Sequence, residues 1–261
     1  TNEIISGKII RKMQQRRKIQ RYAEINFFPY LGDETNNPLP DNVMNTFEGY
    51  PMERYEAKTT IDVTKTLVYR YLCVVFGWSE EYNDRVGELL DRVAWKLQNP
   101  AQRSRKINVL YSTVQGIGKS AFFRFLCLIF SKELCCFHSS VSQYDLRFDV
   151  HLNSKMVHFV DDLQGATKSQ TRKLFPRVTE EYHTYEKKGE TPNVMNEFSE
   201  LWISGNDKAG SLYVSPDDRR VLIYEANPVL KDKKQFWINL YSEFNNLEVA
   251  KAWFDFLKHR D

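Results

Sequence analysis

The sequence contains few cysteines and no long apolar run. Its 4 cysteines include no C-x-x-C pair, which argues against a disulfide framework or a zinc site and favours a reducing, intracellular compartment. The longest apolar stretches, residues 67–76 and 121–130, are interrupted by Arg70 and Arg124. Since a membrane-spanning helix needs about 20 apolar residues, we expect neither stretch to span a membrane.

The sequence also lacks a strong excess of charge of either sign. Among 261 residues, 37 are Lys or Arg, 34 are Asp or Glu, and 42% are hydrophobic. That apolar fraction is too high for a disordered chain and is enough for one compact core with a smaller accessory domain. The chain opens on Thr1 rather than Met and has no secretory leader pattern, so we expect a processed product or a piece of a longer protein.

Positive charge is concentrated near the amino terminus. Residues 8–21 contain 7 Lys or Arg and no acid, and Ile5, Ile9 and Met13 recur at every fourth position. This spacing predicts an amphipathic helix with a basic face. The helix is either a solvated linker or a contact for nucleic acid, and composition alone favours the linker.

The pattern along the rest of the chain predicts four regions. They are a basic helix with a loop-rich segment (1–60), a helical collar or oligomerisation region (61–102), a core of alternating strand-like and helical runs (103–230) and C-terminal helices (231–261). In the second region, Asp62 or Thr64 can cap a helix that runs through Val75. Another helix is expected over 79–97, where apolar residues recur at intervals of three and four. Asn99-Pro100 should end this helix.

Short β-like and helical runs alternate in the core region. We expect strands at 107–111, 156–160, 200–204 and 220–224, and helices at 121–130 and 169–175. Continuous apolar strands separated by helices are typical of a largely parallel sheet that is covered on both faces. The predicted fold class is therefore α/β, with a helical domain before the sheet.

A glycine-containing turn follows the first of these strands. Gly116 and Gly118 let the backbone wrap closely, so that successive amide groups can converge on phosphate oxygens. The helix that starts near Lys119 adds the positive end of its dipole. Lys119 would reach the β- and γ-phosphates of ATP, and the Ser120 hydroxyl would contact Mg²⁺. The residues predicted to bind ATP are Gly116, Ile117, Gly118, Lys119, Ser120 and Ala121.

Polar side chains follow the next two strands. Because the carboxyl ends of parallel strands share one edge of a sheet, Asp161 and Asp162 should face the predicted phosphate loop. Asp161 would hold Mg²⁺ through water, and Asp162 would polarise the attacking water. Asn206, after the strand at 200–204, could sense the γ-phosphate or help to place that water.

Two arginines precede the last strand. Arg219 or Arg220 could stabilise the charge that develops on the γ-phosphate bound by a neighbouring subunit. The alternative is an ordinary surface salt-bridge cluster with Asp217 and Asp218, which this segment taken alone favours.

The order of these motifs resembles that of the superfamily 3 helicases of viruses and plasmids. Within that group, the chain is similar to the helicase part of the primase-helicases of large DNA viruses, phages and mobile elements. The likeness covers roughly residues 45–261 and is carried by RVAWKLQNPAQRSRKINVLYSTVQGIGKS, KKGETPNVMNEFSELWISGND and SPDDRRVLIYEANP, with NTFEGYPM as a weaker match. The resemblance implies an AAA+-like P-loop ATPase core that unwinds duplex DNA during replication.

The resemblance also implies a ring, usually of six subunits, with ATP bound between neighbours. The phosphate loop and the magnesium residues would act within one subunit, together with Asp162 and Asn206. Arg219 or Arg220 would act from the adjacent subunit.

A hairpin in the central channel of such a ring would carry the DNA. By position this hairpin is residues 182–191, with Lys187 and Lys188 at its tip. Two cations there could meet the phosphates of single-stranded or forked DNA without identifying bases. An upstream primase domain is a further partner that only the resemblance implies.

Two other functions remain open. A genome-packaging or protein-remodelling ATPase would use the same chemistry without separating strands. A degenerate NTPase that serves as a replication scaffold is favoured by Thr113, where the strict P-loop motif has glycine, and by Asp162, where a longer glutamate is common. Four motifs in one order favour the helicase.

The histidines and tryptophans carry weaker signals. The histidines show no metal-ligand spacing, and His158, inside an expected strand, is assigned to the core or to the surroundings of the site. The 5 tryptophans fall at core-like spacings and are assigned to packing.

Overall fold

The computed structural model describes residues 24–31, 38–77, 84–144, 152–161, 167–186, 188–189, 191–206 and 218–261. The predicted basic helix at 8–21 lies outside these residues, as do Asp162 and Lys187. The chain divides after Gly49 into two compact units. Among the described residues, no helix has the length and apolar character needed to cross a membrane.

The described part of the first unit contains a small parallel sheet. Its strands are β1 (Glu24–Asn26) and β2 (Val43–Asn45). The Asn45 side chain accepts a hydrogen bond from the Phe28 amide (2.9 Å) and donates one to the Phe28 carbonyl (3.0 Å). This side chain therefore ties the segment after β1 to the end of β2.

The second unit is built on a five-stranded parallel sheet. Its strands are β3 (Ile107–Tyr111), β4 (Cys135–His138), β5 (Val157–Asp161), β8 (Glu200–Gly205) and β9 (Val221–Glu225). Their order across the sheet is β4-β5-β8-β3-β9, and every neighbouring pair is parallel. All five strands therefore end at one edge of the sheet, and β3, the first in the chain, lies between β8 and β9.

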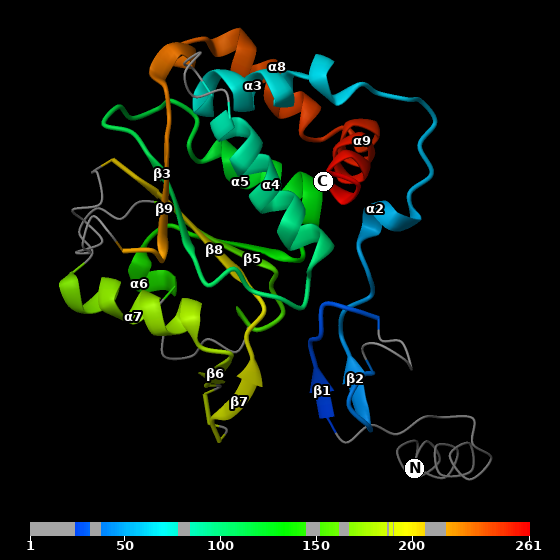
Figure 1. Ribbon diagram of the computed structural model, residues 1–261, viewed down its shortest axis with the longest axis vertical. Coiled ribbons are helices and arrows are strands. Elements are labelled where there is room, and N and C mark those ends of the chain that lie inside the picture. The colour runs from blue at the N-terminus through cyan, green and yellow to red at the C-terminus, as the bar shows by residue number, and fades with distance from the viewer. Residues whose placement is uncertain are drawn as a thin grey trace, which may run out of the picture. The chain divides into compact units, whose positions relative to one another are not determined.

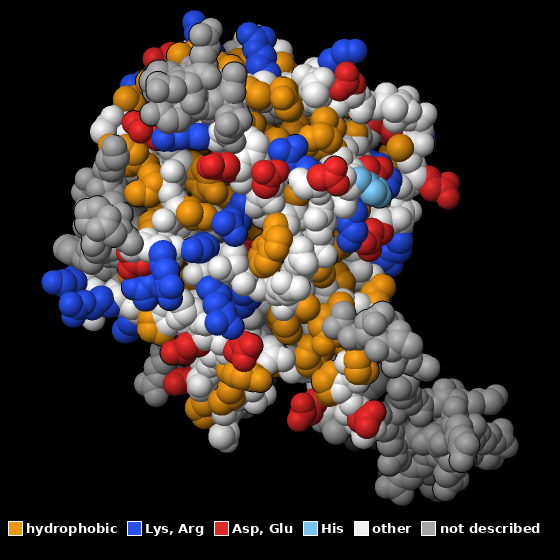
Figure 2. Space-filling view, in the orientation of Figure 1, with side chains coloured by type: hydrophobic (Ala, Val, Ile, Leu, Met, Phe, Trp, Pro, Cys, Tyr) orange, Lys and Arg blue, Asp and Glu red, His pale blue; other side chains and the backbone are white. Residues whose placement is uncertain are grey.

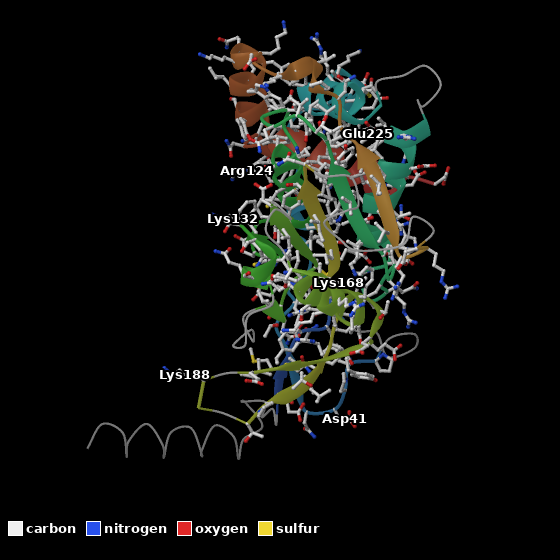
Figure 3. All side chains as sticks on the ribbon, turned by 90° about the vertical axis from the view of Figure 1, so that its left-hand side faces the viewer. Asp41, Arg124, Lys132, Lys168, Lys188 and Glu225 are labelled. Atoms are coloured by element: carbon white, nitrogen blue, oxygen red, sulfur yellow. The ribbon has the colours of Figure 1, made fainter. Side chains whose placement is uncertain are left out.

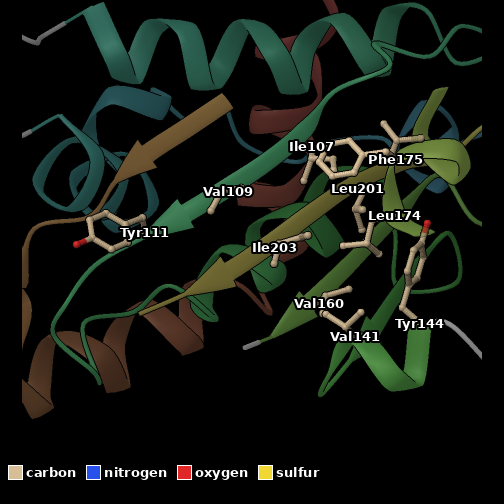
Figure 4. Close-up of a cluster of buried hydrophobic side chains, with 11 residues drawn as sticks. Ile107, Val109, Tyr111, Val141, Tyr144, Val160, Leu174, Phe175, Leu201 and Ile203 are labelled. Carbon is tan, nitrogen blue, oxygen red and sulfur yellow. The ribbon is translucent and has the colours of Figure 1, made fainter. Parts of the chain in front are cut away.

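Two helices cover one face of this sheet, α6 (Val141–Tyr144) and α7 (Lys168–Thr179). Figure 4 shows apolar side chains of β3, β5 and β8 gathered with those of the two helices, among them Val109, Ile203 and Leu174, which are at most 1% exposed. Alternate residues of each strand reach this layer because successive side chains point to opposite faces.

The other face is covered by α5 (Ala121–Phe130), which is buried along most of its length. The ring of Phe122 lies 4.8 Å from that of Trp202 on β8, and Phe125 lies 5.3 Å from Trp253. Outside α5 lie the remaining long helices, α3 (Leu67–Phe76), α4 (Asp84–Gln98), α8 (Lys234–Glu243) and α9 (Leu247–Lys258). Figure 1 shows α4, α5 and α9 on one side of the sheet and α6 and α7 on the other.

A hairpin leaves the sheet layer before β8. Its strands, β6 (Tyr182–Tyr185) and β7 (Asn193–Asn196), pair in antiparallel fashion. The hairpin lies toward the amino edge of the sheet, at the end of the unit opposite α3 and α8 (Figure 1). The short elements are α2 (Pro51–Arg54), η1 (Val63–Lys65) and η5 (Pro228–Leu230).

The α/β class, the parallel sheet and its helical cover on both faces are confirmed, and the four predicted strands match β3, β5, β8 and β9 within one residue. The predicted start of the first long helix is wrong. Asp62 caps η1 instead, and α3 begins at Leu67, where the Thr66 hydroxyl accepts a hydrogen bond from the Tyr69 amide (3.1 Å).

Candidate functional site

The segment between β3 and α5 turns at the carboxyl edge of the sheet. Gly116 and Gly118 have φ angles of 73° and 97°, which residues with a Cβ rarely adopt. A Cβ on Gly116 would meet no atom within 4 Å, whereas a Cβ on Gly118 would lie 2.1 Å from the ring of Trp237. Conformation alone therefore calls for glycine at 116, and both conformation and close packing call for it at 118.

Two aromatic residues from the helical layer hold this turn. The Tyr71 hydroxyl on α3 donates to the Gly118 carbonyl at 2.7 Å, and burial raises the pKa of Tyr71, so the donor proton is retained. The Trp237 indole on α8 donates to the Leu230 carbonyl at 2.9 Å. The rings of Tyr71 and Trp237 meet edge to face with 5.9 Å between centroids. The turn is thereby fixed against both helices.

The predicted phosphate-binding lysine lies beside the predicted sensor residue. Lys119 Nζ is 2.7 Å from Asn206 Oδ1 and 3.3 Å from the Val114 carbonyl oxygen. Lys119 is only 7% exposed, and Asn206 directly follows β8, the neighbour of β3. The fold thus joins two polar side chains that lie far apart in the sequence.

The predicted magnesium residues also lie together. Ser120 Oγ is 3.0 Å and 2.8 Å from the two carboxylate oxygens of Asp161, at the end of β5. Ser204, which pairs with Asp161 across β5 and β8, donates its hydroxyl to the same carboxylate. All of these groups are oxygen donors, the ligand type that Mg²⁺ prefers. They could hold the ion next to the glycine-containing turn.

A cavity of about 500 Å³ connects these groups. This volume lies within the range of small-molecule sites, about 300–1,000 Å³. Its lining comprises Gln115, Gly116, Ile117, Gly118, Lys119, Ser120, Ala121, Asp161, Ser204, Asn206, Trp237 and Tyr241. All six residues predicted to bind ATP line it, as do Asp161 and Asn206.

The two predicted arginines lie at the opposite edge of the sheet, just before β9. The Arg220 guanidinium donates two hydrogen bonds to Asp218 (2.9 Å and 2.7 Å) and the Arg220 amide a third (3.0 Å), and together they lower the pKa of Asp218 to about 2. Its guanidinium group also lies over the ring of Phe175, 4.3 Å from the centroid, whereas the Arg219 side chain is exposed. Because five residues of strand extend about 17 Å, neither arginine meets the turn of its own chain.

The predicted DNA-binding tip is described in part. Lys188 is exposed at the end of the β6–β7 hairpin, beside Gly189 with a φ of 83°, and Figure 3 shows it well away from the sheet. Lys187 lies outside the described residues, as does Asp162, so the structure does not place these two predicted side chains.

Four lining residues lie outside the predicted site, namely Gln115, Ser204, Trp237 and Tyr241. Gln115 directly precedes the first glycine of the predicted turn. Ser204 stands two residues before Asn206, a spacing that puts both on one face at a strand end and could have indicated it. Trp237 was assigned to packing, and it both packs on Gly118 and lines the cavity. Tyr241 follows one helical turn later, and nothing in the sequence indicates that α8 lies against the β3–α5 turn.

A second polar cluster lies between β4, β5 and α7, away from this cavity. The Cys136 sulfur and one ring nitrogen each of His138 and His158 lie within 4.8 Å of one another. Because these residues come from two neighbouring strands, β4 and β5, the cluster shows no metal-ligand spacing in the sequence. His138 Nε2 is 3.1 Å from His158 Nδ1. Burial, then His138 and Arg177, holds the pKa of His158 well below its ordinary value. The nearby cationic Arg177 disfavours the binding of a dication at this cluster.

The described residues thus define an α/β protein with a five-stranded parallel sheet flanked by helices and a polar cavity at the carboxyl edge of the sheet.

Among solved structures, the chain is similar to the C-terminal region of NrS-1. With the A form apo structure it has a TM-score of 0.71 and 18% identity over 92% of this chain and 55% of that chain. With the apo structure of residues 305–718 it has a TM-score of 0.70 and 18% identity over 91% and 55%. At this identity the likeness shows the fold, and the chain spans little more than half the length of those chains.

The sequence matches a family model over part of its length. A family model described as a family of unknown function (DUF5906) matches residues 110–220, which run from β3 to the start of β9 and make up less than half of the chain. No curated protein matches the sequence.

Proposed function

We propose that this chain is a subunit of a ring-forming, ATP-driven helicase that unwinds DNA during the replication of a virus or mobile element, inside the cell. The observation that carries the proposal is the meeting of Lys119 with Asn206 and of Ser120 with Asp161 in one cavity. The likeness of the motif order to superfamily 3 helicases supports it.

Each group in the cavity suits one task in ATP hydrolysis. Lys119, beside the turn, would contact the β- and γ-phosphates, and the positive end of the α5 dipole would favour the same anions. Ser120 and Asp161 would hold Mg²⁺, which when bound neutralises charge on those phosphates. Asn206 would orient water or sense the γ-phosphate, and Asp162 would polarise the attacking water.

The arrangement of the arginines favours ATP sites that are shared between subunits. Arg219 and Arg220 lie at the edge of the sheet opposite the turn, so only a second copy of the chain could bring them to the phosphates. Arg220 is held by Asp218 and Phe175, whereas the Arg219 side chain is exposed. We therefore assign the arginine that acts on the neighbour to Arg219.

The test is nucleotide hydrolysis by single variants of the whole chain. Lys119→Ala should lower ATP hydrolysis at least about 100-fold, because it removes the cation that meets the phosphates. Asp161→Asn should raise the Mg²⁺ concentration needed for half-maximal activity. Lys132→Ala changes an exposed lysine outside the cavity and should hydrolyse ATP normally.

Normal hydrolysis by Lys119→Ala would refute the proposed site. A forked-duplex assay then tests the helicase assignment separately. Hydrolysis stimulated by DNA without strand separation would instead indicate a packaging or remodelling motor.

A further inference from the structure

The cavity has one aromatic side. Trp237 and Tyr241 are four residues apart on α8, which places them on the same helix face, and both line the cavity. Tyr241 is 43% exposed, which is high for so large a ring. Apart from these two aromatic residues, the polar side chains that line the cavity come from the β3–α5 turn, β5 and the end of β8. The cavity thus has a polar end and an aromatic end.

The aromatic side is held in a fixed position relative to the turn. Trp237 packs directly on Gly118, and its indole N–H is anchored to the Leu230 carbonyl. Tyr71 contacts both partners, through its hydroxyl to the Gly118 carbonyl and through its ring to Trp237. The spacing between the turn and the ring of Tyr241, one helical turn further along α8, is therefore set before any ligand binds.

From this geometry we propose that the base of the bound nucleoside triphosphate stacks on Tyr241, with Trp237 as the floor of the subsite. The inference rests on the proposed function, since it requires the triphosphate at Lys119 and Ser120. With the phosphates at Lys119 and Ser120, the nucleoside must occupy the rest of the cavity. The exposed aromatic surface in that part of the cavity is the ring of Tyr241. A flat base on an aromatic ring is a favourable contact that every base can make.

The chemistry of this subsite predicts weak discrimination between bases. The α8 side of the cavity offers two rings, and the Trp237 N–H is already used by Leu230. Base identity is distinguished by hydrogen bonds at the base edges, not by stacking on the ring face. ATP and GTP should therefore bind with affinities within about tenfold of each other.

Binding of three probes, Mg-ATP, Mg-GTP and Mg-tripolyphosphate, to the whole chain tests the inference. Tyr241→Ala should weaken ATP and GTP binding about 10- to 100-fold and leave tripolyphosphate binding within twofold, because tripolyphosphate has no base. Tyr241→Phe keeps the ring and should bind ATP normally. Ile238→Ala changes a 63% exposed residue of the same helix outside the cavity and should change none of the three affinities.

The possible outcomes separate this inference from the proposed function. If Tyr241→Ala binds ATP like the unmodified chain while Lys119→Ala does not, the base subsite is wrong and the phosphate site stands. If Tyr241→Ala loses tripolyphosphate as well, Tyr241 shapes the turn and the subsite is again wrong. If the unmodified chain binds none of the probes, the proposed function and this inference both fail.

Discussion

Gly116 and Gly118 both have positive φ angles but differ in the space around them. Alanine at either position would incur a conformational cost of about 1–2 kcal/mol. At Gly118 the new Cβ would also lie 2.1 Å from the Trp237 ring, whereas at Gly116 it would meet no atom within 4 Å. Urea denaturation should therefore give a free energy of unfolding that falls slightly for Gly116→Ala and clearly further for Gly118→Ala. Equal stability of the two variants would show that Trp237 does not pack on the turn.

His158 should make stability depend on pH. Burial and the neighbouring His138 and Arg177 hold its pKa well below the ordinary value in the folded chain. The unfolded chain therefore takes up a proton near pH 6.5, where the folded chain does not. The free energy of unfolding should thus be constant with respect to this group above pH 6.5 and fall below it, by up to about 1.4 kcal/mol per pH unit.

Chemical denaturation between pH 7.5 and 5.5 measures this effect. His158→Gln should be less stable than the unmodified chain at pH 7.5, and the difference should shrink by about 1 kcal/mol at pH 5.5. For His259→Gln, at an exposed position, the free energy of unfolding should change with pH as it does for the unmodified chain. A constant difference between His158→Gln and the unmodified chain would mean that His158 takes up its proton equally well in the folded and unfolded states, so that its pKa is not lowered by the fold.

At the scale of elements, the β6–β7 hairpin offers an electrostatic test. Lys188 at its tip and Lys187, which precedes it in the sequence, are predicted to meet DNA phosphates. Each contact with a single strand adds about 0.7 to the slope of log K against log salt. Lys187→Ala with Lys188→Ala should weaken binding of single-stranded DNA and lower that slope by about 1.4. The binding should weaken equally for unrelated base sequences, because phosphate contacts carry no sequence information.

The control for the hairpin is a second pair of exposed lysines, Lys58→Ala with Lys132→Ala, which removes the same charge elsewhere. If both double variants change the slope equally, the chain binds DNA through its general charge. An unchanged slope in the hairpin variant would exclude the tip from the DNA site.

The bounds of a helix or strand could be predicted where its own sequence pattern determines them, and could not where tertiary packing does. The continuous apolar runs of β3 and β8 follow from burial on both faces, so their bounds could be predicted. The start of α3 could not, because Asp62 and Thr66 are both good caps and the choice between them depends on packing. β4 is a short edge strand with mixed exposure, which gives no clear pattern.

The site shows the same division. Lys119, Ser120, Asp161 and Asn206 could be predicted because a parallel sheet brings its strand ends to one edge whatever the loops do. Tyr241 could not be predicted, since its place in the cavity depends on how α8 packs against the β3–α5 turn. That packing is a tertiary contact between distant segments, and a single sequence carries no period or spacing for it.

At the scale of the whole molecule, the proposed function assigns complementary halves of an ATP site to the two edges of the sheet. The carboxyl edge has the turn and the Ser120–Asp161 pair, and the amino edge has Arg219. Figure 2 shows Lys and Arg side chains gathered over the region of α7 and the amino ends of β3 and β9, and the exposed Arg105, Arg172 and Arg219 belong to these segments. A head-to-tail contact between copies would bring this basic surface to the triphosphate of the neighbour, and repeated head-to-tail contacts form a ring when the rotation between neighbours closes.

Mixing two inactive variants tests this arrangement. Arg219→Ala should hydrolyse ATP about 10³-fold more slowly or worse, and Lys119→Ala at least about 100-fold more slowly. In a mixed ring, an Arg219→Ala subunit supplies an intact turn, and its Lys119→Ala neighbour supplies an intact Arg219. About a quarter of the interfaces in an equal random mixture are then complete, so hydrolysis should recover toward a quarter of the normal rate.

Arg220 provides the matched comparison for that experiment. Because Asp218 holds Arg220 in its own subunit, Arg220→Ala should lower stability more than it lowers the hydrolysis rate of the folded protein. If instead Arg220→Ala alone is inactive and recovers hydrolysis on mixing with Lys119→Ala, while Arg219→Ala alone hydrolyses ATP normally, then Arg220 leaves Asp218 on assembly and is the residue that acts on the neighbour. If neither mixture recovers, although native mass spectrometry shows that subunits exchange, the two edges do not form one site and each chain hydrolyses ATP alone.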